Sequence, residues 1–417
     1  MLVLEYKAKC NQSQKQAIDE AIRTSQFIRN KAIRYWMDSP KEAKINRIAL
    51  NNYSTALRKE FSFVEELNSM ACQSATERAW QAIQRFYDNC KKKVVGKKGY
   101  PRFQKDNRSV EYKTSGWSLH PTKRRITFTD KKGIRELKLL GKWDIHTYPV
   151  KLIKRVRIVK RADGFYVQFC VETEVNQEPR IADGEIGLDV GLEYFYSDSN
   201  GHHEPNPRFL RKSEKSIKHA QRRIYTKEKC KNQRRKARQR YARKHLKVSR
   251  QRNEHAKRIA RNVCKANALV AYEDLKVKNM VKNHCFAKSI NDAAWSTFCH
   301  WLEYFAVKFN SLVVAVTPHY TSQKCSNCGA IVKKSLSTRT HKCSCGSCLH
   351  RDVNAAINIL NLGKQAREGH SQSNATGVET TTLLGVNLEK PSFDYECRIP
   401  MSLDRGVSKQ INIYLSC

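Results

Sequence analysis

The stretch IGLDVGL (residues 186–192) decides the fold class of this 417-residue chain. Its large apolar residues alternate with Gly187, Asp189 and Gly191, so a strand here turns the apolar side chains to one face and Asp189 to the other. An acid between two glycines has no bulky neighbour on its own face, which leaves room for a backbone segment or a metal ion. We therefore expect a half-buried strand that carries Asp189 toward a functional site.

Strand-like and helix-like segments alternate downstream of this strand. A second strand and a turn complete EIGLDVGLEYFYSDSNG (185–201). After them come a basic helical segment, a strand at 268–273, a helix at about 290–310, a strand at 311–316, a cysteine cluster and a helix at 351–362. This order predicts a mixed sheet covered by helices.

Upstream, the sequence predicts an antiparallel, barrel-like β domain. Residues 1–9 alternate as a strand, and β-branched and aromatic segments such as VEYKT, RITF, LIKRVRIV and FYVQFCVE recur from about 108 to 178. The intervening helical region, 11–95, would be inserted into this β domain. The fold class is therefore α/β with several domains.

The inserted region reads as two helices. Apolar residues at helical spacing predict one helix that starts at a capping box of Ser13 and Gln16 and ends at Pro40, and a second helix over 62–90. The segment 91–103 carries Lys, Gly and Pro, so we expect an exposed basic turn there.

Charge indicates the class of partner. Lys and Arg number 79 and Asp and Glu 39, which gives a net charge of +40. Because each basic group near a phosphate releases condensed counterions, nucleic acid is the leading partner. An anionic membrane is the rival, but the sequence has no apolar run near 18 residues and no signal peptide. We expect a soluble cytoplasmic protein with no membrane partner.

Much of this charge is concentrated between Arg211 and Arg261, where 22 Lys and Arg stand against three acids. Such an excess would repel itself without a polyanion, so we expect nucleic-acid binding rather than only a solvated face. Tyr225 and Tyr241 in this segment would either stack on bases or pack between helices. The candidate contact residues are Arg211, Lys212, Arg222, Arg223, Arg234, Arg235, Arg243, Lys244, Lys247 and Arg250.

Two further acids extend the pattern that Asp189 begins. Glu273 ends an apolar strand, and Asp352 opens a helix in which Ala355 and Ala356 are small enough to let it lie close on a sheet. Each acid alone has an ordinary explanation, as strand-end charge, a turn or a helix cap. Their order along the chain is the arrangement of the RNase H-like fold. Three converging carboxylates would hold two Mg²⁺ ions, with Mn²⁺ as a substitute, for phosphodiester hydrolysis.

Five of the 15 cysteines lie within 24 residues, which favours a metal site over disulfides. Cys325 and Cys328 form a first knuckle. For the second, we favour Cys343 with Cys345, and Cys348 is the alternative to Cys345. The spacing predicts a zinc ribbon with a structural Zn²⁺, and His341 would be a bystander.

Six motifs carry a family resemblance: IGLDVGL (186–192), NPRFLRKSEKSIKHAQRRI (206–224), LVAYEDLKVKNMVKN (269–283), SINDAAWSTF (289–298), PHYTSQKCSNCG (318–329) and HRDVNAAINIL (350–360). With them the chain resembles TnpB, the OrfB-type protein of small bacterial insertion sequences. The resemblance covers about residues 1–362 and is most specific from 183 onward. The nuclease core also resembles that of type V CRISPR effectors.

The resemblance implies an RNA-guided, metal-dependent DNA endonuclease encoded by a transposable element. A barrel-like domain (1–10 and 96–180) with a helical recognition insert of helix-turn-helix character (11–95) would hold a guide RNA and read a short motif beside the target. A RuvC-like domain (181–321 and 349–362) would cut double-stranded DNA with Asp189, Glu273 and Asp352. The zinc ribbon would be residues 322–348, and residues 363–417 would form a flexible tail.

Other expectations concern partners and location. The guide RNA would derive from the transposon end, and pairing with the guide would choose the DNA sequence. The protein would act as a monomer at the bacterial nucleoid.

Two features depart from the family pattern. The second cysteine knuckle is Cys-x-Cys instead of Cys-x-x-Cys, and His350 stands where many relatives have the first Asp of Asp-Arg-Asp. Three rival functions have different requirements. A guide-directed regulator without cleavage should lose at least one of the three acids. A strand-transfer transposase would need a His-x-His motif that SNGHHEP (199–205) lacks, and an RNA-binding protein with only a structural zinc would not cut DNA.

Overall fold

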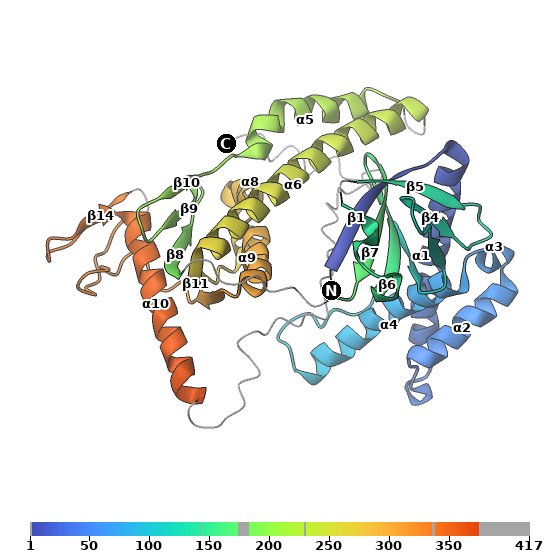
Figure 1. Ribbon diagram of the computed structural model, residues 1–417, viewed down its shortest axis with the longest axis horizontal. Helices are drawn as coiled ribbons and strands as arrows, with labels where there is room; N and C mark the ends of the chain where they lie inside the picture. Colours follow the sequence, from blue (N-terminus) through green and yellow to red (C-terminus); the bar gives the residue numbers. More distant parts are fainter. Residues whose placement is uncertain (1, 142, 174–182, 229–230, 336–337, 375–417) are drawn as a thin grey trace. The chain divides into compact units, whose positions relative to one another are not determined.

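The computed structural model describes residues 2–141, 143–173, 183–228, 231–335 and 338–374 (Figure 1). By its internal contacts the chain divides into two compact units, Met1–Glu174 and Val175–Cys417. The predicted domain boundary between 180 and 181, and the predicted tail beyond residue 374, lie outside the described residues. Within the described ranges, none of the helices combines the length and the apolar character that crossing a bilayer requires.

Unit 1, Met1–Glu174, is built on a seven-stranded antiparallel sheet of order β2-β6-β7-β1-β5-β4-β3. Its strands are β1 Leu2–Lys9, β2 Ser109–Lys113, β3 Trp117–Leu119, β4 Arg125–Phe128, β5 Glu136–Leu140, β6 Ile153–Arg161 and β7 Gly164–Val171. The predicted N-terminal strand is confirmed as β1, which lies between β7 and β5. Because β2 and β3 stand at the two ends of the order, the sheet is an open half-barrel.

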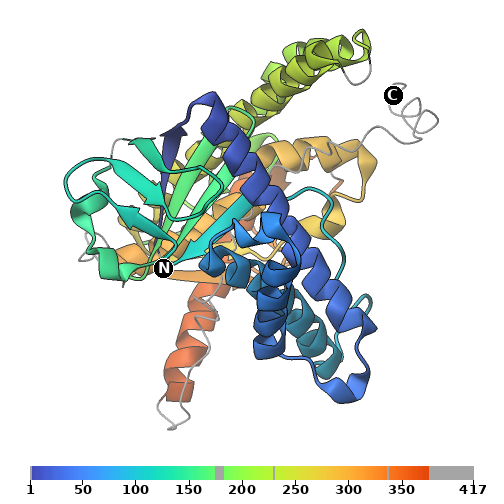
Figure 2. The same cartoon turned by 90° about the vertical axis from the view of Figure 1, so that its right-hand side faces the viewer.

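The helices of unit 1 lie together on one side of this sheet (Figure 2). They are α1 Gln12–Asp38, α2 Arg47–Glu60, α3 Ser62–Glu65 and α4 Ser69–Lys91, with short 3-10 turns at Lys41–Ala43, Ile145–Thr147 and Val150–Leu152. The predicted capping box of Ser13 and Gln16 is wrong. Asn11 caps α1 instead, since its side chain accepts the Gln14 amide at 2.8 Å while Gln14 accepts the Asn11 amide at 3.0 Å.

The single helix predicted over 62–90 is also wrong. The chain turns between α3 and α4, and the Asn68 side chain accepts the Met70 amide at 2.8 Å to begin α4. The helix α2 was not predicted. Its buried residues are Leu50, Ser54 and Leu57.

Glu111 on β2 is the most deeply buried acid that unit 1 pairs with cations. Arg155 and Arg157 donate to it at 2.7 and 2.8 Å, and Arg78 lies 3.6 Å away. Burial alone would raise the pKa of Glu111, but these three guanidinium groups lower it to about 2. The folded unit therefore holds Glu111 ionised.

Unit 2, Val175–Cys417, is built on a five-stranded mixed sheet of order β10-β9-β8-β11-β12. Its strands are β8 Gly184–Val190, β9 Tyr194–Asp198, β10 His203–Pro205, β11 Asn267–Glu273 and β12 Leu312–Val316. Strands β8, β11 and β12 are parallel neighbours, and β9 runs antiparallel to both β8 and β10. The predicted mixed sheet is thus confirmed.

The two faces of this sheet carry different helices. On one face, Ile186, Leu188 and Val270 pack with α6 (Asn232–Ala266) and α9 (Trp295–Phe309). On the other face, Ala271 packs against α10 (Arg351–Asn374). The alternation in IGLDVGL predicted this division, since its apolar residues face the first core.

Three further helices complete unit 2: α5 Phe209–Tyr225, α7 Val277–Met280 and α8 His284–Ala293. Helices α5 and α6 pair as a long hairpin (Figure 1). The helix predicted over 290–310 is interrupted at Ala294, whose φ of 57° ends α8 and starts α9.

The predicted end of the last helix, at residue 362, is wrong because α10 continues to Asn374. Gly363 does not stop it. A Cβ at this position would lie 2.6 Å from the Ala271 Cβ, so the glycine allows the helix to lie directly on β11. Glu185 of β8 then pairs with Lys364 at 2.7 Å and Arg367 at 2.6 Å, which fixes the next turn to the sheet.

Candidate functional site

Strand register brings two of the predicted acids to one face of the unit 2 sheet. Strand β8 pairs with β11 through Ala271 to Gly187 and Tyr272 to Leu188, and continuing this register sets Glu273 beside Asp189. Residues two positions apart on a strand face the same side of the sheet. Gly187 and Ala271 lie two positions before Asp189 and Glu273, respectively, and both face α10. Asp189 and Glu273 therefore lie at the carboxyl ends of adjacent parallel strands, on the α10 face.

The third acid, Asp352, is in the first turn of α10, and Gly187 fixes how close that helix lies. A Cβ on Gly187 would lie 2.1 Å from the Ala356 carbonyl oxygen and 2.8 Å from the Leu360 amide nitrogen. No side chain fits there. The backbone of α10 thus packs on the backbone of β8, two residues from Asp189, as the glycine and alanine pattern predicted.

The surroundings of Asp189 and Glu273 disfavour the ionised form of both carboxyl groups. Burial raises the pKa of Asp189 well above its ordinary value, and the charges of Glu273 and Asp352 raise it further, while Arg351 lowers it. Burial also raises the pKa of Glu273, against a hydrogen bond from the Thr321 hydroxyl that lowers it. A bound divalent cation would compensate the negative charge of such buried carboxylates.

The carboxylates share a face but not the close spacing of the cysteines. Among the residues that the structure describes, the four cysteines are the only group of three or more Cys, His, Asp or Glu whose ligand atoms all lie within 4.8 Å of one another. Asp352 has Arg339 at 3.9 Å and His350 Nδ1 at 4.0 Å. The roles of Asp189, Glu273 and Asp352 stay a prediction.

A polar row extends from the acids across the sheet, and the sequence did not reveal it. Asp189 pairs with Ser197 of β9, which in turn pairs with His203 of β10, so all three side chains share one face. Ser197 Oγ lies 2.7 Å from His203 Nδ1, and the His203 ring stacks on Tyr194 and meets the edge of His350. No motif in the sequence marks His203, and only the pairing of β9 with β10 indicates its place in this row.

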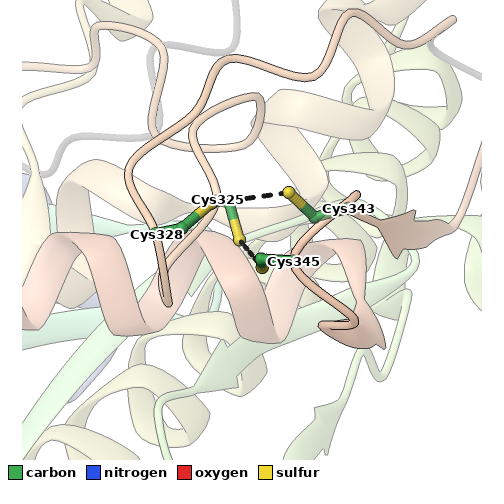
Figure 3. Close-up of side chains that lie close together, drawn as sticks. All are labelled: Cys325, Cys328, Cys343 and Cys345. Atoms are coloured by element: carbon green, nitrogen blue, oxygen red, sulfur yellow. Dashed lines mark hydrogen bonds between the residues drawn. The ribbon is translucent and has the colours of Figure 1, made fainter.

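The cysteine prediction can be tested against the geometry of Zn²⁺. Four cysteines, Cys325, Cys328, Cys343 and Cys345, converge in the segment 321–350, which also contains β13 (Thr340–Lys342) and β14 (Cys348–His350) (Figure 3). The sulfur atoms of Cys325 and Cys345 lie 3.7 Å apart, and those of Cys328 and Cys343 lie 3.5 Å apart. Sulfurs at the corners of a tetrahedron around zinc, each about 2.3 Å from the ion, would be about 3.8 Å apart. The four thiols fit a structural zinc.

Neither Cys348 nor His341 belongs to that group. Cys348 is exposed, while the ring of His341 is fully buried and in contact with Lys334. Burial alone would raise the pKa of Cys325, but the amides of Cys328 and Asn327 help lower it to about 5. A lowered pKa favours the thiolate that a metal ion binds. The neighbouring Cys328 has the opposite shift: the Ala330 amide lowers the pKa of its thiol, but hydrogen bonds with Cys343 and Cys345 raise it to about 12.

The basic hairpin of α5 and α6 presents most of the predicted contact residues to solvent. Arg211, Lys212, Arg222, Arg223, Arg235, Arg243, Lys247 and Arg250 are exposed, and Lys244 is half-buried. Arg234 is the exception. It is 8% exposed, lies over the Tyr225 ring at 6.0 Å and donates to the Lys227 carbonyl at 3.3 Å, so it closes the hairpin instead of facing a ligand.

A buried acid holds the base of this hairpin. Asp292 of α8 accepts the Leu210 amide at 2.9 Å, at the start of α5, and it also pairs with Arg252 of α6 at 2.8 Å. The residue before α5, Arg208, makes no capping hydrogen bond. Asp292 therefore supplies the cap from another helix and joins α5, α6 and α8.

Comparisons with known proteins agree with these observations. Residues 168–284 match the OrfB_IS605 family model, described as "Probable transposase", and residues 295–359 match the TNB domain of Cas12f1-like proteins. The chain is a TnpB-type protein. The two matches span the strands with Asp189 and Glu273, the cysteine segment and the start of α10.

Two relatives of this TnpB-type protein extend the similarity over longer stretches. The "Putative RNA-guided DNA endonuclease" of Streptomyces pristinaespiralis is 29% identical over 74% of this chain and 75% of its own. The "Putative RNA-guided DNA endonuclease InsQ" of Escherichia coli K12 is 28% identical over 51% of this chain and 57% of its own. A cryo-EM structure of a Cas12f1–sgRNA–target DNA complex aligns with a TM-score of 0.49 at 13% identity, over 84% of this chain and 81% of that chain.

Proposed function

We propose that this TnpB-type protein is an RNA-guided DNA endonuclease of a transposable element, which cuts DNA with divalent cations held by Asp189, Glu273 and Asp352. The observation that carries the proposal is the placement of Asp189 and Glu273 on adjacent parallel strands that face α10, with Asp352 in the first turn of that helix. Burial raises the pKa of Asp189, and the charges of Glu273 and Asp352 raise it further. The names of the two relatives support the substrate class. The strand order of unit 2 supports an RNase H-like, RuvC-type assignment of this unit.

Each group near the site has a definite task in this proposal. The cations, preferably Mg²⁺ with Mn²⁺ as a substitute, would supply charge stabilisation to the attacking and leaving oxygens. Asp189 and Glu273 are set by strand register and Asp352 by α10. The hydroxyl of Thr321 orients Glu273 by a hydrogen bond, which leaves the other carboxylate oxygen available as a ligand.

The basic hairpin would bind the phosphate backbone. Its exposed Arg and Lys residues lie on two helices fixed by Asp292, so contacts along a strand need little reordering of the protein. Recognition of sequence would come from pairing with a guide RNA, and unit 1 would hold the guide and read a short motif beside the target. The four thiolates would hold a structural Zn²⁺. The chain would work as a monomer at the nucleoid.

The test is plasmid cleavage. The chain would be expressed with its native flanking DNA, and the purified ribonucleoprotein would meet a plasmid with the guide-matched target beside randomised bases. We expect linear product with Mg²⁺ and none with EDTA or with Asp189→Asn, whereas Asp88→Asn, which changes an exposed acid of α4, should cut normally.

A second candidate is a guide-directed DNA-binding regulator of transposition that does not cut. All three acids are present, which favours the nuclease. Tight, guide-dependent target binding with intact DNA in every metal tested would instead make the acids structural and support the regulator.

A further inference from the structure

Two buried asparagines of α10 join this helix to the segment that carries the cysteines. Asn354 is fully buried and Asn358 is 7% exposed, and residues four apart lie on the same face of a helix. Their side-chain amides therefore face the same neighbour, the stretch from Thr321 to Ser326. A buried side-chain amide destabilises the fold unless its hydrogen bonds are made, so the contacts of these two asparagines contribute to the stability of unit 2.

Both amides bind backbone groups of the first cysteine knuckle. Asn354 Nδ2 donates to the Lys324 carbonyl at 2.8 Å, and Asn354 Oδ1 accepts the Ser326 amide at 2.9 Å. Asn358 Nδ2 donates to the same Lys324 carbonyl at 2.7 Å. Asn354 is thus hydrogen-bonded to the backbone on both sides of Cys325.

The hydrogen bonds of Asn358 also lead to Glu273, the acid at the end of β11. Asn358 Nδ2 also donates to the Thr321 carbonyl, at 2.8 Å, and the Thr321 hydroxyl donates to Glu273. Thr321, Glu273, Asn354, Asn358 and Cys325 are all less than one-tenth exposed. A continuous buried chain of hydrogen bonds therefore runs from the cysteine knuckle to the start of α10 and to Glu273.

A second contact ties the other end of the cysteine segment to α10. The Arg351 amide donates to the Arg339 carbonyl at 2.7 Å, next to Asp352. The first turn of α10, which would otherwise expose free amides, is thereby held by the same segment. The position of Asp352 thus depends on the cysteine segment from two sides.

We propose that Asn354, Asn358 and Thr321 are positioning residues through which the zinc-bound cysteine knuckle sets the spacing of Asp352 and Glu273, and so their affinity for divalent cations. The inference rests on the proposed carboxylate site. Zinc at the four thiolates fixes the Cys325 turn, the asparagines transmit its position to α10, and Thr321 transmits it to Glu273. Removal of zinc, or of either amide, should weaken cation binding at carboxylates that are themselves unchanged.

The experiment measures Mn²⁺ binding by electron paramagnetic resonance on the full chain with its guide RNA. Binding that Asp189→Asn abolishes defines the carboxylate site. We expect Asn354→Ala and Asn358→Ala to weaken this binding about tenfold, the usual effect of losing a partner that orients a ligand. Asn361→Ala, which truncates an exposed asparagine of the same helix, is the matched control and should leave it unchanged.

Thr321 offers a variant pair that tests the hydroxyl itself. Thr321→Val removes the hydroxyl at nearly constant shape, and Thr321→Ser keeps it. We expect weaker Mn²⁺ binding with valine and recovery with serine. Zinc content, measured with a chromogenic chelator after digestion, should stay at one per chain in all these variants.

The outcomes separate the two proposals. If the wild-type chain shows no binding that depends on Asp189, the carboxylate site itself is wrong and this inference falls with it. If wild type binds Mn²⁺ but zinc-loaded Asn354→Ala, Asn358→Ala and Thr321→Val bind it equally well, the nuclease proposal stands and the positioning role is overturned. Mercurial release of zinc from wild type should weaken binding by the same factor, with little added effect in Asn354→Ala.

Discussion

Replacing Gly187 by alanine should disable the carboxylate site without touching an acid. The added Cβ would lie 2.1 Å from the Ala356 carbonyl oxygen, whereas real Cβ atoms hardly ever approach closer than 3.0 Å. The backbone of α10 must therefore move away from β8 by about 0.9 Å. Neither partner is a flexible side chain, so the strain cannot be relieved locally.

Two magnitudes follow from this displacement. Overpacking of a core costs about 1–3 kcal/mol, and a contact between two backbones belongs at the upper end, about 3 kcal/mol of unfolding free energy for unit 2. Asp352 moves with α10, and a misplacement of about 1 Å at a reacting centre can lower a rate about 100-fold. We expect the cleavage rate constant of Gly187→Ala to fall by about that factor at saturating Mg²⁺.

The assay is single-turnover cleavage of a guide-matched duplex, alongside thermal unfolding of the ribonucleoprotein. Gly191→Ala is the control, since its Cβ would lie 3.2 Å from the Tyr194 carbonyl oxygen and needs only a small shift. It should retain most of the activity. If Gly187→Ala cleaves at the wild-type rate and unfolds at the wild-type temperature, the close packing of α10 on β8 is refuted. The dependence of Asp352 on that packing is then refuted as well.

Three further predictions address other parts of the chain. Cys345→Ala should lower the zinc content of the purified protein, whereas Cys348→Ala should leave it unchanged, because Cys345 and not Cys348 lies with the other three thiols. The reverse result would identify Cys348 as the fourth zinc ligand. Arg235→Ala should reduce the salt dependence of nucleic-acid binding by about one phosphate contact, whereas Arg234→Ala, equal in charge, should mainly lower the unfolding temperature. Glu111 has a pKa lowered from 4.5 to about 2, so its contribution, about 3 kcal/mol, is present above pH 4.5 and is lost as the pH falls toward 2; acid unfolding of wild type with the same pH dependence as Glu111→Gln would contradict this.

The parts of the fold that follow from local pattern were predictable from the sequence. Alternation in IGLDVGL predicted which face of β8 carries Asp189, and the small residues Ala355 and Ala356 predicted the close approach of α10. Cysteine spacing predicted the group of four thiols. Each of these rests on side chains a few positions apart, whose relation is fixed by the period of a strand or helix.

The errors arose where a contact distant in sequence overrides the local pattern. Gly363 reads as a helix stop, yet contact with Ala271 makes it the residue that lets α10 continue. Arg234 reads as one more exposed cation, yet Tyr225 across the hairpin covers it. His203 joined the row of Asp189 only through the pairing of β10 with β9, which no spacing along the chain predicts.

The same distinction separates the three acids. Asp189 and Glu273 are positioned by hydrogen bonds between strands, which hold as long as the sheet is intact. Asp352 is not held by hydrogen bonds between strands. Its position depends on the packing of α10 against Gly187, on the hydrogen bonds of Asn354 to the cysteine segment, and on the Arg339 carbonyl, which accepts the Arg351 amide. A weak perturbation of unit 2 should therefore displace Asp352 before the other two. It follows that variants in α10 or in the cysteine segment should lose cation binding at temperatures where the sheet, followed by circular dichroism, is still folded.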